Sequence, residues 1–155
     1  MSRWEVGDVM TADVVSVRAD APLNEVLYVL ALHGVSAVPV VDAGGRVLGI
    51  LTTADVLTGA QAAAATYRRR LLDARRHGYA RSRPAGAVAA DLLTAPVMTI
   101  PARASVASAA KLLATAGVSR LPVVDDEGRL TGIVSRPDVL KVFDSAPTQP
   151  HASIR

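Results

Sequence analysis

The sequence predicts a mixed α/β (α+β) protein built from two copies of one β-α-β-β-α unit. Two observations support this prediction. The chain matches itself without a gap at an offset of 83 residues, and each copy alternates short β-branched runs with helical apolar spacing. Half of the 155 residues are hydrophobic and 20% are charged, which excludes a disordered or solvating chain.

The internal repeat aligns residues 8–57 with residues 91–140, and 22 of the 50 aligned pairs are identical. The densest stretches set G-V-S-A-V-P-V-V-D against G-V-S-R-L-P-V-V-D, and G-R-V-L-G-I against G-R-L-T-G-I. Such a match indicates a duplication in which each copy is one structural unit. About 50 residues are marginal for an independent core. We therefore expect the copies to pack about a pseudo-twofold axis, leaving two equivalent clefts between them.

Each element of the unit follows from its local pattern. Strands at 14–17 and 97–100 open the copies, because V-V-S-V and V-M-T-I are β-rich and bounded by turn formers. A helix with apolar spacings of three and four follows in each copy, and it ends at Gly34 or Gly117, since glycine favours the position after a helix. The other expected elements are strands at 38–41, 46–52, 121–124 and 129–135, paired as hairpins, and helices that begin at 54 and 137.

The net charge of +3 is concentrated between the copies. Residues 58–90 contain seven arginines and one acid, a balance of +6, so the rest of the chain carries −3. Residues 61–76 have high helix propensity and should extend the helix that begins near 54, with His77-Gly78 as its stop and an exposed connection at 81–86. The expected organisation is a first repeat, a basic helical linker, a second repeat and a disordered tail, at 1–58, 59–90, 91–144 and 145–155.

The sequence gives no support for a metal-binding, catalytic, secreted or membrane-spanning protein. With no cysteine there is no disulfide, thiolate metal site or cysteine nucleophile. The three histidines (33, 77 and 151) lack metal-ligand spacing, and no phosphate-binding glycine loop occurs, so we expect no metal, no required cofactor and no catalytic residue. The first residues contain no apolar signal region, and no apolar run reaches the roughly 18 residues of a membrane span. The expected location is the cytoplasm.

Both copies resemble the cystathionine β-synthase (CBS) domain, in the tandem arrangement called a Bateman module. The resemblance rests on V-S-A-V-P-V-V-D and V-S-R-L-P-V-V-D, on G-R-V-L-G-I-L-T-T-A-D (45–55) and G-R-L-T-G-I-V-S-R-P-D (128–138), and on D-V-M-T (8–11) with its altered version D-L-L-T (91–94). It covers about two thirds of the chain and leaves 58–90 and the tail unaccounted for. It implies a regulatory protein without catalysis, whose interdomain clefts bind AMP, ADP, ATP, S-adenosylmethionine or another adenosine derivative. It also implies a disc-shaped homodimer formed through the helices.

The shared G-h-h-[ST]-x-x-D motif (h, apolar) has a physical logic. Thr52 and Ser135 end a strand directly before a helix, where a hydroxyl and free backbone N–H groups suit phosphate or sugar oxygens. Asp55 and Asp138 lie in the first helical turn, where a carboxylate can accept both hydroxyls of a ribose. The alternative is that these aspartates only stabilise the helix N-terminus.

The resemblance assigns residues to each cleft. The first cleft would combine Val15, Val35, Ser36, Ala37, Arg120, Ile133, Ser135, Arg136 and Asp138. The second would combine Met98, Val118, Ser119, Ile50, Thr52, Thr53 and Asp55. The apolar members would line the base, or else pack as ordinary core.

The two clefts differ in charge. Arg120 and Arg136 favour a phosphorylated ligand in the first cleft, because guanidinium matches phosphate bidentately, whereas the equivalent residues of the other cleft are Ala37 and Thr53. We expect the Asp138 cleft to bind AMP, ADP or ATP more tightly. The alternative is that both arginines are solvated surface charges.

The expected function is an adenine-nucleotide sensor that signals to a partner protein, which the residues do not identify. The alternatives are a ligand-free structural or interaction module and a binder of S-adenosylmethionine or NAD. The basic linker would be a solvated helix, a partner-docking or ligand-gating element, or a nucleic-acid site in which Tyr67 and Tyr79 stack on bases. Nucleic acid is the least favoured of these, because no recognition motif accompanies the arginines.

Overall fold

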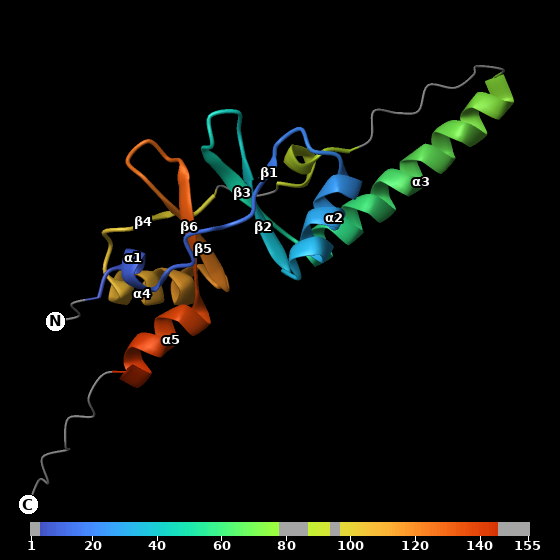
Figure 1. Ribbon diagram of the computed structural model, residues 1–155. Coiled ribbons are helices and arrows are strands. Elements are labelled where there is room, and N and C mark those ends of the chain that lie inside the picture. The colour runs from blue at the N-terminus through green and yellow to red at the C-terminus, as the bar shows by residue number, and fades with distance from the viewer. Residues whose placement is uncertain (1–3, 78–86, 94–96, 146–155) are drawn as a thin grey trace, which may run out of the picture. The chain divides into compact units, whose positions relative to one another are not determined.

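The computed structural model describes residues 4–77, 87–93 and 97–145, and the chain divides into two compact units (Figure 1). The first unit is Val15–Met98, and the second joins Met1–Val14 to Thr99–Arg155. Each unit contains a three-stranded sheet with helices, which confirms the mixed α+β class. The predicted connection at 81–86 and the tail after residue 145 lie outside the described residues.

The first unit has the predicted β-α-β-β-α order. Its sheet runs β1-β2-β3, with β1 parallel to β2 and β2 antiparallel to β3. Helix α2 begins after Pro22 and ends at Gly34, whose left-handed backbone (φ 61°) is the conformation that glycine favours. The elements are β1 (Val17–Arg18), α2 (Leu23–His33), β2 (Ala37–Val41), β3 (Val47–Thr52), α3 (Thr53–His77) and the 3-10 helix η1 (Ala89–Leu92).

The second unit repeats this order and the same strand register. Its sheet runs β4-β5-β6, again parallel and then antiparallel. Helix α4 begins after Ser105, whose hydroxyl accepts the backbone N–H of Ser108 at 3.0 Å. The elements are α1 (Val6–Val9), β4 (Ile100–Pro101), α4 (Val106–Ala116), β5 (Arg120–Val124), β6 (Leu130–Ser135) and α5 (Arg136–Ser145).

The strands that open the copies are shorter than predicted. β1 begins at Val17 and β4 at Ile100, so the predictions of strands over 14–17 and 97–100 were wrong. The parallel register would bring the preceding residues opposite Pro39 and Pro122, whose backbones face β1 and β4 and have no N–H to donate. A β-branched run forms a strand only where a neighbouring backbone completes its hydrogen bonds.

Each unit has its own apolar core, drawn mainly from strands and from one face of each helix. In the first unit it consists of Val17, Ala21, Leu23, Val26, Leu30, Val38, Val40, Leu51, Val56 and Ala89. In the second unit it consists of Val6, Ile100, Val106, Ala109, Leu113, Leu121, Val123, Val134, Val139 and Val142. Aliphatic side chains fill both cores, which explains how a chain with so few aromatic residues folds.

The compact units cut across the sequence repeats. Two short leading segments, residues 5–11 and 88–93, each pack in the unit of the other repeat. In the second unit, Val6 is fully buried and its N–H donates to the carbonyl of Ala104 at 2.8 Å. In the first unit, Ala89 occupies the equivalent place and donates to Ala21 at 2.9 Å. The two leading segments therefore make equivalent contacts, but each makes them in the unit of the other repeat.

The glycine of the G-h-h-[ST]-x-x-D motif makes room for the exchanged leading segment. A Cβ at Gly132 would lie 2.8 Å from the backbone oxygen of Thr11 and 2.6 Å from the sulfur of Met10. Thr11 and Ile133 also exchange two backbone hydrogen bonds of 2.9 Å beside it. Among the described residues, the atoms nearest to a Cβ at Gly49 belong to the side chain of Leu93, the first at 2.6 Å. Close approach of the chain explains why both copies carry glycine here.

Helix α3 confirms the predicted extension into the linker. It runs without interruption from Thr53 to His77 and continues well past α2 (Figure 1). Its first two turns pack in the first unit, where Val56 is fully buried and Gly59 lies against Leu92. No helix in the described part of the chain is long and apolar enough to cross a membrane.

Candidate functional site

Thr52 and Asp55, two predicted site residues of the first unit, lie where β3 ends and α3 begins. The backbone N–H of Thr52 donates to Oδ2 of Asp55 at 3.0 Å, and the N–H of Asp55 donates to the Thr52 hydroxyl at 3.2 Å. This reciprocal pair supplies partners for two backbone donors at the helix N-terminus. Asp55 therefore stabilises the helix, as the alternative interpretation expects. Within the described residues, its Oδ1 has no protein hydrogen-bond partner.

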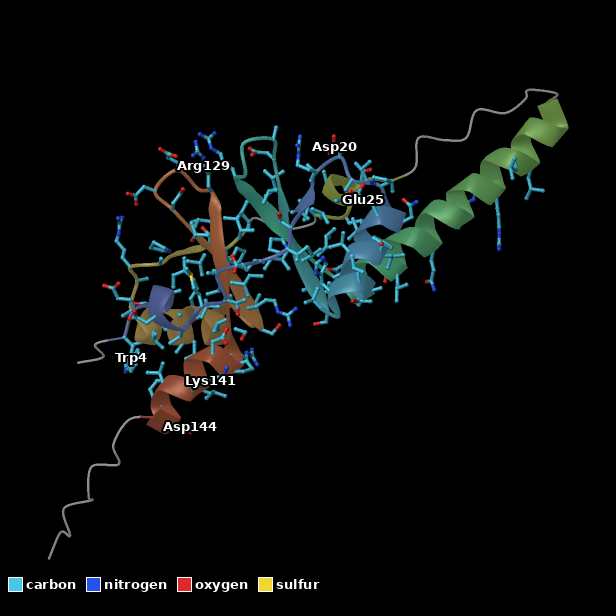
Figure 2. The ribbon with its side chains drawn as sticks, viewed as in Figure 1. Trp4, Asp20, Glu25, Arg129, Lys141 and Asp144 are labelled. Atoms are coloured by element: carbon cyan, nitrogen blue, oxygen red, sulfur yellow. The ribbon has the colours of Figure 1, made fainter. Side chains whose placement is uncertain are left out.

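The second unit has the same arrangement at the start of α5. Oδ2 of Asp138 accepts the N–H of Ser135 at 2.9 Å and the Ser135 hydroxyl at 2.8 Å. Oδ1 faces the ammonium group of Lys141 at 4.0 Å, and only 14% of the Asp138 side chain is exposed. Figure 2 labels Lys141 on α5, one turn along from Asp138. Sequence reasoning missed Lys141, although its i,i+3 spacing on a predicted helix was available as a signal.

The two predicted site arginines, Arg120 and Arg136, lie at the same end of the second unit's sheet as Asp138. Arg120 pairs across the ladder with Ser135, and Arg136 is the first residue of α5. Nε of Arg136 donates to the carbonyl of Val118 at 3.2 Å, which holds the start of its side chain against the turn before β5. Positive charge therefore gathers at this sheet end beside the hydroxyl and N–H groups of the helix N-terminus.

The two equivalent positions of the first unit carry uncharged side chains. Ala37 pairs with Thr52 where the second unit has Arg120, and Thr53 replaces Arg136. The Thr53 hydroxyl donates to the carbonyl of Ser36 at 3.2 Å, and its backbone N–H donates to the same carbonyl at 2.9 Å. The backbone is thus the same at both ends, whereas at these two positions the described side chains are cationic in the second unit and not in the first.

The apolar site residues differ in burial. Val35 is 42% exposed and Met98 41% exposed, and neither belongs to a buried cluster. Ala37 is buried, and Val118 packs against the core of the second unit. The remaining apolar members are partly buried: Val15, Ile50 and Ile133. Ser36 and Ser119 are exposed at the turns that precede β2 and β5. Of the apolar members, Val35 and Met98 thus have the most surface that a ligand could contact.

The structure brings together the predicted residues within each unit. In the first unit, Ser36, Ala37, Thr52, Thr53 and Asp55 meet at one sheet end. The second unit gathers Val118, Ser119, Arg120, Ser135, Arg136 and Asp138 in the same way. Because each predicted cleft takes members from both units, the two clefts remain predictions.

The described residues offer no metal centre, since no group of three or more His, Asp or Glu is placed to hold a cation. What each sheet end provides is hydroxyls, helix N–H groups and a carboxylate, with guanidinium groups added in the second unit. This set of groups can bind a polar ligand that carries hydroxyls and phosphate.

The two equivalent units define a tandem repeat protein. The CBS domain family model matches residues 6–61 and 88–145, well over half of the chain. The chain therefore belongs to the CBS domain family and carries two CBS domains.

Similar proteins differ in their overall organisation. The chain is 29% identical over 142 residues to the uncharacterized protein MK0525 of Methanopyrus kandleri, covering 92% of this chain and 64% of that protein. It is 31% identical over 141 residues to inosine-5'-monophosphate dehydrogenase of Mycobacterium bovis, covering 91% of this chain and 22% of the enzyme. The chain thus spans less than two thirds of either relative.

Two solved structures are similar over most of the chain. The crystal structure of CBSX2 in complex with AMP has a TM-score of 0.70 and 27% sequence identity, covering 90% of this chain and 96% of that one. The cytosolic domain of the Mg2+ channel MgtE in complex with ATP has a TM-score of 0.67 and 29% identity, covering 89% of this chain and 48% of that one.

Proposed function

We propose that this protein is a non-catalytic regulatory module that binds AMP, ADP or ATP between its two CBS repeats and signals to a partner protein. The observation that carries the proposal is the pair of sheet ends, each with a hydroxyl, helix N–H groups and an aspartate whose Oδ1 makes no hydrogen bond within the described residues. The two similar structures in complex with AMP and ATP support an adenine nucleotide as the ligand.

We propose the same ligand residues for the two clefts as in the sequence analysis. One cleft would use Val15, Val35, Ser36, Ala37, Arg120, Ile133, Ser135, Arg136 and Asp138. The other would use Ile50, Thr52, Thr53, Asp55, Met98, Val118 and Ser119. The aspartate would accept the ribose hydroxyls while the helix N-terminus binds phosphate. The repeats themselves would be 1–58 and 91–144, with 59–90 as the linker between them.

The cleft that contains Asp138 would bind nucleotide more tightly than the cleft that contains Asp55. Arg120 and Arg136 lie at the second unit's sheet end, and guanidinium groups bind phosphate in charge-assisted pairs. Removing the Asp138 carboxylate should therefore weaken AMP and ATP binding at least about tenfold, while the Asp55 change has a smaller effect.

Titration calorimetry with AMP and ATP tests this asymmetry in Asp138→Ala and Asp55→Ala. Because both aspartates also stabilise a helix N-terminus, Asp138→Asn and Asp55→Asn provide the controls. Asparagine keeps an oxygen for the backbone N–H but removes the charge. Equal losses in the two alanine variants would contradict the asymmetry.

A ligand-free interaction module and an S-adenosylmethionine or NAD binder are the competing functions. A ligand that binds only the folded state raises the melting temperature by mass action. A thermal-shift panel of AMP, ATP, NAD and S-adenosylmethionine separates the three possibilities. A rise with AMP or ATP supports the proposal, a rise only with the other two replaces the ligand, and no rise with any compound favours the interaction module.

We also propose that the protein forms a homodimer through its helices. Several large apolar side chains on the helices are exposed, at 50% to 65% of their surface: Tyr28, Leu32, Leu57, Leu140 and Phe143. Apolar side chains gathered on helix surfaces are typical of interfaces between subunits. Each ligand would then bias the relative arrangement of the repeats, and with it the docking of a partner.

A further inference from the structure

Residues 61–77, the distal segment of α3, are not explained by the nucleotide site. At 1.5 Å per residue this segment is about 25 Å long. Every residue in it whose side chain is described is exposed: Gln61, Ala65, Arg68, Arg69, Leu71 and Leu72. By contrast, Val56 and Gly59, nearer the start of the helix, are buried. An isolated helix of this length is marginal in water, so a partner would stabilise it.

The sequence of this distal segment and the residue before it has the spacing of a helix-pairing seam. Apolar residues recur at 60, 64, 67, 71 and 74, with alternating steps of four and three, and arginines flank this row at 68, 70 and 75. Leu71 is the described member of the row and is 41% exposed. Helical geometry, with about 100° per residue, places Arg68 at the edge of the row, whereas Arg69 and Leu72 lie away from it.

The charges beside the row determine which helix it can accept. If two copies of α3 paired in parallel, the residues at 70 and 75 would approach each other, and both are arginine. An antiparallel pair would bring together the positions 68 and 75, again arginine against arginine. Like charges across a helix interface disfavour pairing, so the row favours a helix with carboxylates at its flanking positions.

Two other classes of partner fit less well. Nucleic acid would use the arginines through its phosphates but would leave the exposed Leu71 without a function. Helices that lie on a membrane present Trp, Phe and Leu on their apolar face, whereas this row consists mainly of alanine. A second helix can approach an alanine-rich row closely.

We propose that residues 61–77 of α3 are a docking site for one acidic amphipathic helix of a partner protein, with Leu71 in the apolar contact and Arg68 paired with carboxylates. The inference specifies the chemistry of the partner in the proposed function, but it does not require nucleotide to bind.

The helix provides matched pairs of neighbouring residues for the test. Arg68 and Arg69 are both exposed, as are Leu71 and Leu72, but only the first of each pair belongs to the row or its edge. The probe is a synthetic three-heptad peptide with Leu and Ala at its seam positions and Glu at its flanking positions, titrated by fluorescence anisotropy into the full chain. A peptide with Lys at the flanking positions is the control.

The Glu peptide should bind and the Lys peptide should not. Arg68→Glu and Leu71→Glu should each weaken binding about tenfold or more, whereas Arg69→Glu and Leu72→Glu should change it less than about threefold. Circular dichroism of each variant confirms that α3 is intact. Absence of binding by the Glu peptide would overturn the proposal, as would equal losses within the pairs.

The same four variants identify the alternative partners. Equal losses for Arg68→Glu and Arg69→Glu on a 20-base-pair duplex, with no binding of the Glu peptide, would indicate nucleic acid. Binding to vesicles containing phosphatidylserine, lost equally in Leu71→Glu and Leu72→Glu, would indicate a membrane surface. AMP calorimetry on the same samples reports the nucleotide site separately, so failure of one proposal is distinguishable from failure of the other.

Discussion

At the scale of single residues, Asp55 and Asp138 stabilise a helix N-terminus, and this role is compatible with the ribose contact that we propose for them. Oδ2 of each carboxylate accepts the backbone N–H of the residue three positions earlier, while Oδ1 makes no hydrogen bond within the described residues. A helix N-terminus stabilised in this way presents a carboxylate in a fixed position. Stabilising the helix and binding a ribose are therefore compatible functions of one side chain.

Arg136 should distinguish phosphorylated from unphosphorylated ligands. Replacing it with glutamine removes the guanidinium but keeps a polar side chain at the start of α5. We expect ATP affinity to fall roughly 10- to 100-fold, the value of one hydrogen bond between charged groups, with adenosine affinity nearly unchanged. Calorimetry with both ligands measures the difference, and Thr53→Ala at the equivalent position of the first repeat is the control. Equal losses for ATP and adenosine would mean that Arg136 does not contact phosphate.

The motif glycine of the second unit should not tolerate alanine. At Gly132 a methyl group would meet the backbone oxygen of Thr11, which cannot move without breaking two hydrogen bonds, so Gly132→Ala should cost about 2 to 3 kcal/mol of unfolding free energy. Urea denaturation measures the change, and a loss below about 1 kcal/mol would refute this explanation.

At the scale of elements, the two copies place different side chains on the same helix surface. Tyr28 and Leu32 of α2 are 65% and 63% exposed, whereas Lys111 and Thr115 occupy the equivalent positions of α4. We therefore expect the apolar pair on α2 to contribute to the proposed homodimer interface.

Charged residues on α2 should therefore dissociate the proposed homodimer. Tyr28→Glu combined with Leu32→Glu should shift the molar mass, measured by light scattering, toward that of the monomer. Lys111→Glu combined with Thr115→Glu is the matched control on α4 and should leave the mass unchanged. A dimer that persists in the α2 variant and dissociates in the α4 variant would place the interface on the other repeat.

At the scale of the whole molecule, each leading segment supplies core residues to the unit of the other repeat. A fragment cut at the repeat boundaries therefore lacks part of its core. The core of the first unit includes Ala89, with Leu92 and Leu93 packed against it, and residues 1–58 contain none of these. The core of the second unit includes Val6, which residues 91–144 lack.

Fragments chosen by the compact units should fold better than fragments chosen by the repeats. A 15–98 fragment contains every core residue of the first unit, whereas a 1–58 fragment lacks the η1 segment that covers one side of it. We expect a cooperative thermal transition, followed by circular dichroism, only for 15–98, because about 50 residues without part of their core are below the size of a stable domain. A cooperative transition of 1–58 at the same temperature would show that the exchanged segment is dispensable.

The sequence by itself determined the local elements and the duplication. Helix spacing, the glycines after α2 and α4, and the hairpins depend on interactions between near neighbours, so their residues predict them. The positions of Asp55 and Asp138 in a first helical turn follow from the same local rules.

Only the tertiary structure decided where the opening strands begin and which unit each leading segment joins. Both depend on contacts between residues far apart in the chain: β1 needs the backbone beside Pro39, and residues 5–11 need the space beside Gly132. Because the two repeats have similar sequences, each leading segment fits either copy, and sequence similarity does not distinguish the two pairings. The packing of Val6 in one unit and Ala89 in the other decides between them, since long-range contacts have no local signal.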